Sequence, residues 1–328
     1  MRLGGVAQFL VEVSSKDELL DAVKWAKSEK LSMLMIGSGS NIIWRDEGYD
    51  GLIIVNNILG FEPLSEDQEN MYVTVGAGEE WDFVVKRTVD MGYSGLECLS
   101  LIPGKAGSTP VQNVGAYGSE ISKSLVSLEA YDLEVGEFVT ITADECRFSY
   151  RSSRFKEEDK HRFLIVAITL RLTTERATPP FYAAVQKYFD ENNITKITPR
   201  VIRDAVISIR QAKLPDPASV PNSGSFFTNP IINNDEFSKL IKEHPNISYW
   251  EVNDNKYKLS AAWLIENAGY KAVNDPETGI STWPTQPLVF INTSAKKTAD
   301  LLKFKDKVVA EVKRKFDVTL VQEPEMLP

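Results

Sequence analysis

The residues whose types and spacing most directly suggest chemistry lie between Gly95 and Gly118. This segment combines five glycines and two prolines with small apolar residues, and it carries almost no charge. Glycine lets a backbone approach a ligand closely, and closely spaced backbone N–H groups form a cradle for a diphosphate or for the polar edge of a flat ring. An irregular loop in the protein core would have a similar composition. The segment therefore predicts either a ligand cradle or a buried loop.

A second glycine-containing loop runs from Gly37 to Asn41, between strands expected over 31–36 and 52–55. A Walker loop or a dinucleotide fingerprint must open a helix, because the helix N-terminus then faces the phosphates. This loop lies between two strands, and no Gly-Lys-Ser/Thr sequence follows it. It is therefore either a phosphate loop of another kind or a plain β-turn.

The composition limits the classes of function. The 328 residues are 43% hydrophobic and 25% charged, which is typical of a globular protein with two or three domains. The formal net charge of −9 argues against a nucleic-acid partner, because phosphate contacts need a basic surface. A few converging Lys and Arg side chains could still bind a small anionic substrate.

Cysteine and histidine are scarce. The two cysteines, Cys98 and Cys146, argue for a reducing compartment without a disulfide framework. With only two histidines as well, a metal site is not expected. No apolar run approaches the roughly 20 residues of a membrane span, and the first residues do not resemble a signal peptide. We therefore expect a cytoplasmic protein with no metal and no membrane insertion.

Hydrophobic periodicity and capping signals predict a mixture of helices and strands. The first helix is expected to begin at a capping box, Ser15 to Glu18. Further helices are expected over 80–91, 181–191, 198–210, 234–242, 260–267 and 298–316, and further strands over 72–75, 125–131, 138–141, 163–172, 288–291 and 318–321. The stiff connector Leu214 to Pro217 is the best candidate for a domain boundary.

Several short motifs follow one another along nearly the whole chain. They are GSGSN from Gly37, the segment from Gly95 to Gly118, Tyr150-Arg151, Lys213 to Pro217, GSFFTNP from Gly224, KL and WLI between Lys258 and Ile265, Gln286, and Glu323-Pro324-Glu325. On these motifs the chain resembles the UDP-N-acetylenolpyruvoylglucosamine reductase (MurB) family of flavoenzymes. The run IPG…QNVGAYG followed by GSFF is highly specific for it, and residues 155–199 resemble the longer, type I branch.

The resemblance implies an α+β fold with an FAD-binding domain of the vanillyl-alcohol-oxidase (PCMH) type and a separate α+β substrate-binding domain. The implied division is an FAD-binding subdomain over 1–60, a second over 61–213 to which 317–328 returns, and a substrate-binding domain over 214–316. It also implies a reaction in two halves. NADPH reduces noncovalent FAD, and reduced FAD then delivers hydride to the enolpyruvyl group of the UDP-sugar, giving UDP-N-acetylmuramate for peptidoglycan synthesis.

Three residues match the family's catalytic positions. Arg151 would bind the substrate carboxylate, since its planar fork fits two carboxylate oxygens. Ser225 would protonate the second alkene carbon, although a hydroxyl is a poor acid unless the developing carbanion is strongly basic. Glu325 would help to polarise or protonate the intermediate, and Glu323 competes for that role. Without the resemblance, the three would be expected to be a solvated arginine, a turn or strand residue and a tail carboxylate.

The resemblance also implies binding residues. The expected FAD cradle is Gly37, Ser38, Gly39, Ser40, Asn41, Gly104, Ser108, Pro110, Gln112, Asn113, Gly115, Ala116, Tyr117 and Gly118. The expected substrate contacts are Tyr150, Tyr182, Lys213, Asn229, Lys271 and Gln286, with the two lysines placed to bind a diphosphate. No histidine lies in these loops, so covalent flavin attachment is not expected.

Some alternatives stay open at this point. Ala272 and Trp283 replace residues usual in the family, and both termini are short, which affects the substrate contacts rather than the reaction class. A flavin oxidase of the same superfamily and a noncatalytic FAD- or nucleotide-sugar-binding protein are the competing hypotheses. The sequence does not distinguish NADPH from NADH, and we expect a monomer.

Overall fold

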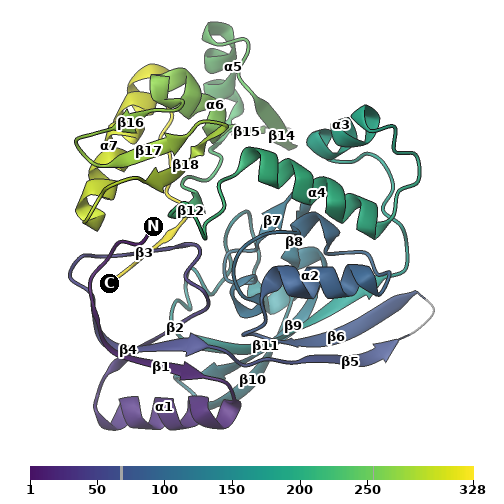
Figure 1. The fold of residues 1–328 in the computed structure, drawn as a ribbon, viewed down its shortest axis with the longest axis vertical. Coiled ribbons are helices and arrows are strands. Elements are labelled where there is room, and N and C mark those ends of the chain that lie inside the picture. Colours follow the sequence, from purple (N-terminus) through teal and green to yellow (C-terminus); the bar gives the residue numbers. More distant parts are fainter. Residues whose placement is uncertain (67–68, 254) are drawn as a thin grey trace. The chain divides into compact units, whose positions relative to one another are not determined.

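The computed structural model describes residues 1–66, 69–253 and 255–328, and the chain divides into two compact units. The N-terminal unit comprises Ala7–Gly39 and Tyr49–Ala212. The C-terminal unit comprises Met1–Val6, Ser40–Gly48 and Lys213–Pro328. Each unit mixes helices and sheets, as the α+β expectation requires (Figure 1).

The described residues of the N-terminal unit form two larger sheets and one two-stranded hairpin. The parallel sheet has the order β1-β4-β2, and the antiparallel sheet has the order β10-β9-β11-β6-β5. The strands are β1 (Ala7–Val13), β2 (Ser32–Ile36), β4 (Tyr49–Asn56), β5 (Phe61–Glu66), β6 (Asn70–Gly76), β9 (Leu125–Asp132), β10 (Glu137–Thr142) and β11 (Phe163–Thr173), with a small hairpin of β7 (Gly115–Ala116) and β8 (Ser119–Glu120). The helices are α1 (Lys16–Ser28), α2 (Trp81–Asp90), α3 (Ala183–Glu191) and α4 (Pro199–Lys213).

The central strand β11 contributes to two cores of this unit. Leu164 and Val166 pack in the core formed with α1 and β4, whereas Ile168 and Leu170 pack in the core formed with α2. A register irregularity opposite β9, between Ile165 and Ala167, shifts the alternation of the strand at this point. Because side chains alternate faces with a period of two, one extra residue moves the following apolar side chains to the other face.

The glycine-rich segment, residues 95–118, packs mainly in the core formed with α2. It includes two short 3₁₀ helices, η1 (Glu97–Leu99) and η2 (Ala106–Ser108), and is followed by η3 (Ile121–Lys123). Helices α3 and α4 enclose a smaller cluster around Phe189, Ile202 and Val206. A further 3₁₀ turn, η4 (Asp144–Cys146), precedes the irregular residues that connect to β11.

The C-terminal unit is built around a four-stranded sheet of order β12-β18-β17-β16 and a three-stranded sheet of order β13-β15-β14. The strands are β12 (Asn222–Ser225), β13 (Ile231–Asn233), β14 (Tyr249–Asn253), β15 (Lys256–Leu259), β16 (Asn274–Asp275), β17 (Ile280–Trp283) and β18 (Gln286–Asn292). The helices are α5 (Asn234–Glu243), α6 (Ala261–Ile265) continued by a π-helical turn η5 (Glu266–Tyr270), and α7 (Thr298–Phe316). One apolar core joins these elements.

Residues 40–48 belong to the C-terminal unit because two sets of hydrogen bonds hold them there. Strand β3 (Ile42–Trp44) pairs in parallel with the last strand, β19 (Glu325–Leu327). The carboxylate of Asp46 accepts hydrogen bonds from the Thr298 and Ala299 N–H groups, at 2.7 and 2.9 Å. A carboxylate at a helix N-terminus satisfies free donors and complements the helix dipole.

The compact units differ from the expected division in two respects. Residues 1–60 do not form one unit, since 1–6 and 40–48 group with the C-terminal part of the chain. Residues 317–328 also group there, because β19 pairs with β3. The units divide between Ala212 and Lys213, one residue before the expected boundary between Lys213 and Leu214. The strand expected over 318–321 was wrong: Val318 and Leu320 are buried, but no ladder forms there.

The expected capping box at Ser15 is only half present. The Ser15 hydroxyl accepts from the Glu18 N–H as predicted, but the Glu18 carboxylate accepts from the Ser14 N–H rather than from Ser15. A complete box forms instead at Asn233 and Glu236, at the start of α5, where the sequence reading had placed only a helix.

Candidate active site

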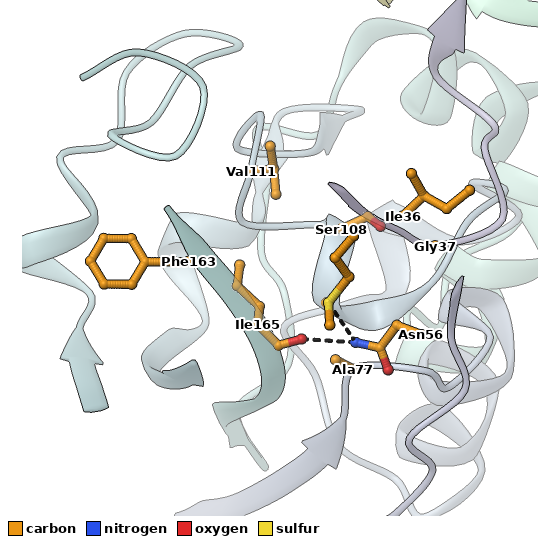
Figure 2. Close-up of a pocket in the computed structure, with 10 residues that line it drawn as sticks. Ile36, Gly37, Asn56, Ala77, Ser108, Val111, Phe163 and Ile165 are labelled. Atoms are coloured by element: carbon orange, nitrogen blue, oxygen red, sulfur yellow. Dashed lines mark hydrogen bonds between the residues drawn. The ribbon is translucent and has the colours of Figure 1, made fainter. Parts of the chain in front are cut away.

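A cavity in the N-terminal unit lies next to the first glycine loop. Its volume is about 70 Å³, and its lining residues come from the end of β2, from β4, from η2 and from β11. Figure 2 shows Gly37 and Ser108 on one side of this cavity and Phe163 and Ile165 on another. The remaining lining residues are Met35, Ile36, Asn56, Ala77, Gly107 and Val111.

Two glycines of this cavity have no room for a side chain. A Cβ on Gly37 would lie 2.7 Å from the Ser108 hydroxyl oxygen, and a Cβ on Gly107 would lie 2.5 Å from the Cβ of Ala77. Gly37 therefore allows the first glycine loop to approach Ser108 closely, and Gly107 allows the glycine-rich segment to approach Ala77. The approach to a ligand that the composition predicts is not tested by these contacts. The first glycine loop supplies five residues of the expected FAD cradle. Gly37, Ser38 and Gly39 belong to this unit, whereas Ser40 and Asn41 belong to the C-terminal unit.

Two polar side chains that the sequence reading missed lie beside this cavity. The Asn56 amide donates to the Ile165 carbonyl at 2.8 Å and to the Met35 sulfur at 3.3 Å (Figure 2). The ammonium of Lys105 is buried and donates to the Asn56 carbonyl at 2.8 Å and to the Asn57 side chain. A lysine inside the glycine-rich segment was the available signal, since that segment is otherwise nearly uncharged.

The glycine-rich segment is a buried loop held by backbone hydrogen bonds. The Ala106 and Gly107 N–H groups donate to the Glu79 and Ala77 carbonyls, at 2.8 and 2.9 Å. Gly104 has a φ of 124°, which favours glycine, and its carbonyl accepts from the Trp81 N–H at 2.9 Å. The buried-loop hypothesis is therefore confirmed, because the segment packs in the core. The segment also lines the cavity, and its role as a ligand cradle stays a prediction.

Arg151 lies against the hairpin of β7 and β8. Its guanidinium donates from Nη2 to the Gly115 carbonyl at 2.7 Å, and a Cβ on Gly115 would lie 3.1 Å from Nη1. The Arg151 guanidinium is also 5.7 Å from the centre of the Tyr150 ring. The structure thus brings together Arg151 and part of the expected FAD cradle.

Tyr117 lies in a second polar group of the same unit. Its ring contacts that of Tyr182 edge-on, with centroids 5.6 Å apart, and the guanidinium of Arg210 on α4 lies near enough to oppose the effect of burial on the tyrosine pKa. Burial raises the pKa of both tyrosines and lowers that of Arg210. Arg210 was missed, since an arginine on an amphipathic helix gives no signal of its own.

Cys98 lies at the edge of the α3–α4 cluster. Burial, together with the neighbouring Glu97 carboxylate, raises the pKa of its thiol to about 12. A thiol with such a pKa is almost entirely protonated at neutral pH and makes a poor nucleophile. Cys98 therefore gives no support to a cysteine-based mechanism.

Ser225 and Glu325 belong to the C-terminal unit, and the segments that carry them are adjacent. Strand β12 ends at Ser225, and the carbonyl of the next residue, Phe226, accepts a hydrogen bond from the Glu323 N–H at 2.9 Å. Phe227 forms an isolated antiparallel bridge with Gln322. Glu325 begins β19, and its N–H donates to the Asn41 carbonyl at 3.0 Å.

The expected substrate residues divide between the units. Tyr150 and Tyr182 lie in the N-terminal unit, and Lys213, Asn229, Lys271 and Gln286 lie in the C-terminal unit. The Asn229 side-chain oxygen accepts from the Ala261 N–H at 2.9 Å, at the start of α6. Lys271 forms an exposed ion pair with Glu266, with 2.6 Å between Nζ and Oε1. Gln286 is the first residue of β18.

The chemistry of the N-terminal unit fits a flavin nucleotide. Gly37 and Gly107 leave backbone exposed to the cavity where a side chain would clash, and the other cavity walls are mainly apolar. Backbone donors and apolar walls are what a nucleotide with a flat ring requires. Among the described residues no group of His, Cys, Asp and Glu side chains is placed to hold a metal ion. In that same part of the chain, no helix is both long and apolar enough to cross a bilayer.

Comparisons with known proteins agree with this reading. A family model described as an FAD-binding domain matches residues 7–142, which makes this chain a flavoprotein by class. A model of the UDP-N-acetylenolpyruvoylglucosamine reductase C-terminal domain matches residues 216–327. The order of the two matches agrees with the expected fold, an FAD-binding domain of the vanillyl-alcohol-oxidase type followed by a separate α+β domain.

Individual relatives define the family. The UDP-N-acetylenolpyruvoylglucosamine reductase of Escherichia coli K12 is 38% identical over 98% of this chain and 91% of its own length. That of Flavobacterium johnsoniae is 37% identical over 97% and 93%. The crystal structure of the reductase (MurB) from Thermus caldophilus has the same fold, with a TM-score of 0.67 at 21% identity over 99% of this chain and 94% of its own. The chain belongs to the UDP-N-acetylenolpyruvoylglucosamine reductase family.

Proposed function

We propose that this chain is an NADPH-dependent flavoenzyme that reduces the enolpyruvyl group of UDP-N-acetylenolpyruvoylglucosamine to form UDP-N-acetylmuramate in peptidoglycan synthesis. One observation carries the proposal: an FAD-binding domain and the reductase C-terminal domain match one chain in order, and relatives with this name align over nearly all of it. FAD, when bound, supplies hydride transfer, a reaction that protein side chains cannot perform alone.

The residues around the cavity would hold FAD. Gly37 and Gly107 line the cavity and would allow close approach of the nucleotide to the backbone, and the resemblance assigns Gly115, Ala116, Tyr117 and Gly118 to the same cradle. Arg151 would bind the substrate carboxylate with its planar guanidinium and neutralise the charge that grows there as hydride arrives. Its contact with the Gly115 carbonyl supports this role, because it places the cation on the expected FAD cradle.

Ser225 would donate a proton to the second alkene carbon. A hydroxyl does this only when the carbon is strongly basic and a neighbour stabilises the resulting alkoxide. Glu325 would assist by polarising or protonating the same intermediate. The hydrogen bond between Phe226 and Glu323 supports this pairing, because it joins the two segments one or two residues from the proposed groups.

Lys213 and Lys271 would bind the diphosphate of the UDP-sugar, and Tyr150, Tyr182, Asn229 and Gln286 would complete the substrate contacts. Ammonium groups suit a diphosphate because they act as compact point charges. The ion pair of Lys271 with Glu266 is exposed, and such pairs contribute little to stability, so the lysine can exchange partners at low cost. We also infer that the protein is cytoplasmic and monomeric. Light scattering on the purified protein would test the monomeric state.

Anaerobic stopped-flow absorbance tests the function. The purified protein should be yellow, NADPH should bleach its flavin absorbance, and the enolpyruvyl UDP-sugar should restore it without oxygen. Bleaching of the flavin by an alcohol, followed by reoxidation when oxygen is admitted, with no response to the UDP-sugar, would favour the oxidase. A yellow protein that completes neither half-reaction would favour a noncatalytic binder.

A further inference from the structure

We propose that Asn113 is a positioning residue for Arg151, and that it acts by holding the turn that carries this arginine rather than by contacting FAD. The proposal rests on the proposed function, in which Arg151 binds the substrate carboxylate. It reassigns a residue that the sequence motif places in the FAD cradle. Every contact that carries it lies within the N-terminal unit.

Arg151 occupies an unfavourable backbone conformation. Ser149 and Ser152 exchange two backbone hydrogen bonds, at 3.0 and 3.2 Å, so Tyr150 and Arg151 form a two-residue turn between them. Arg151 has a φ of 56°, in the left-handed region that glycine or asparagine usually takes at this turn position. A bulky residue held there costs on the order of 1–3 kcal/mol, and it persists only where the surroundings determine it.

Asn113 supplies the contact that determines the turn on its first side. Its side-chain amide nitrogen donates to the Ser149 carbonyl at 3.1 Å and to the Glu120 carboxylate at 2.8 Å. Its side-chain oxygen accepts from the Ser122 N–H at 3.2 Å. Both amide hydrogens and one oxygen lone pair are thus used within the protein. Asn113 is 1% exposed, which leaves its amide little surface for a ligand.

Ser153 supplies a matching contact on the other side of the turn. Its hydroxyl donates to the Val111 carbonyl at 2.6 Å, and it is also buried. Asn113 and Val111 are two residues apart in the glycine-rich segment, so both ends of the Arg151 turn are attached to one short stretch of backbone. The same stretch of backbone leads into Gly115, whose carbonyl accepts a hydrogen bond from the Arg151 guanidinium.

This arrangement links the position of the guanidinium to the glycine-rich segment. Catalytic groups must be held to within a fraction of an ångström, and a displacement of about 1 Å can cost roughly 100-fold in rate. Loss of the Ser149 contact should therefore weaken binding and reduction of the enolpyruvyl substrate. It should leave reduction of the flavin by NADPH almost unchanged, because Arg151 has no proposed role in that step.

The test uses the double variant Asn113→Asp/Glu120→Gln in the holoenzyme. Aspartate tolerates the left-handed φ of 47° at position 113 as asparagine does. The amide introduced at position 120 can donate to the carboxylate introduced at position 113, so this link is restored with donor and acceptor exchanged. That carboxylate has no hydrogen to give to Ser149, and its oxygen faces the Ser149 carbonyl oxygen, so the hydrogen bond to the turn is replaced by a repulsion. Glu120→Gln alone keeps both hydrogen bonds that the Asn113 amide donates and is the matched control.

We expect the double variant to keep its flavin and to be reduced by NADPH at nearly the wild-type rate. Its reoxidation by the enolpyruvyl UDP-sugar should be slower by roughly 10- to 100-fold, with a higher substrate KM. Glu120→Gln should behave as the wild type in both halves. Wild-type reoxidation in the double variant would overturn the proposal, and equal slowing of both halves would show that Asn113 acts on the flavin instead.

A second variant keeps the test decisive if the double variant loses flavin or fails to fold. Ser153→Ala removes the other attachment of the turn and leaves residue 113 intact. It should also slow reoxidation selectively, and unchanged reoxidation would count against the proposal. If the wild-type protein itself does not reduce the enolpyruvyl UDP-sugar, the proposed function fails, which is a different result from a fully active variant.

Discussion

The turn that carries Arg151 and the strand that carries Ser225 lie in different units and are held by different interactions. Hydrogen bonds from Asn113 and Ser153 attach the Arg151 turn to the glycine-rich segment. Ser225 ends a strand that pairs with β18, and the side chains that follow it are held by apolar packing, because Phe226 and Phe227 are at most 1% exposed. Phe226 stacks on Phe290 with ring centroids 4.5 Å apart.

The difference shows how each region should respond to mutation. Hydrogen bonds have strict requirements for donors and acceptors, so an isosteric change can remove one without creating a cavity. Apolar packing depends on volume, so truncation costs stability before it alters any particular polar contact. Mutations in the Arg151 turn should therefore lower the reaction rate at a nearly constant free energy of unfolding. Mutations beside Ser225 should lower both the free energy of unfolding and the rate.

The largest expected effect comes from removing the proposed proton donor. Ser225→Ala should slow flavin reoxidation by the enolpyruvyl UDP-sugar by roughly 10²- to 10⁴-fold, the usual contribution of a general acid. Flavin reduction by NADPH should stay close to the wild-type rate. Stopped-flow traces of both half-reactions check this, and similar slowing in both would show that the role of Ser225 is misassigned.

Phe226→Ala tests the packing side of the comparison. Loss of a fully buried phenylalanine should lower the free energy of unfolding by about 3–5 kcal/mol. Urea titration of the variant and the wild type measures the change, and Phe226→Leu, which keeps most of the volume, serves as the control. A small loss of stability in the alanine variant would mean that Ser225 is not held by this packing.

Arg151→Lys tests the polar side. Lysine keeps the charge but cannot make two parallel hydrogen bonds to a carboxylate. Loss of one charge-assisted bond, worth about 1.5–3 kcal/mol, should reduce kcat/KM for the UDP-sugar by roughly 10- to 100-fold. The unfolding curve should barely move. A lysine variant with full activity would exclude the two-point contact.

The smallest effect concerns acid stability. Burial raises the pKa of the Asp82 carboxyl, but hydrogen bonds from Arg203 and from the Leu101 N–H lower it. Together these hydrogen bonds hold the pKa below its ordinary value of 3.8. A lowered pKa means that this stabilisation is complete above the ordinary value and is lost as pH falls through the folded-state value. Asp82→Asn should be less stable than the wild type at pH 7, and the gap should shrink as the pH falls below the ordinary value of 3.8. Urea titrations across that range measure it, and a constant gap would contradict the assignment.

Local signals in the sequence predicted much of the secondary structure. The helix expected over 198–210 begins as a capped helix should, because the Thr198 hydroxyl accepts from the Val201 N–H at the start of α4. Gly269 adopts a φ of 92° near the expected end of its helix. The last strand was misplaced, since Val318 to Val321 are apolar enough for a strand but find no neighbouring ladder. Pairing with a distant strand is a tertiary property, and local composition does not report it.

The sequence by itself determined the family, the flavoprotein class and the glycine positions, because these depend on residue types at short spacings. Only the tertiary structure showed that Asn113 attaches to the turn before Arg151, that Arg210 contacts Tyr117, and that β19 pairs with β3. Each of these contacts joins segments that are distant in the sequence. Which distant donor meets which acceptor follows from the packing of whole elements, and no local pattern encodes that choice.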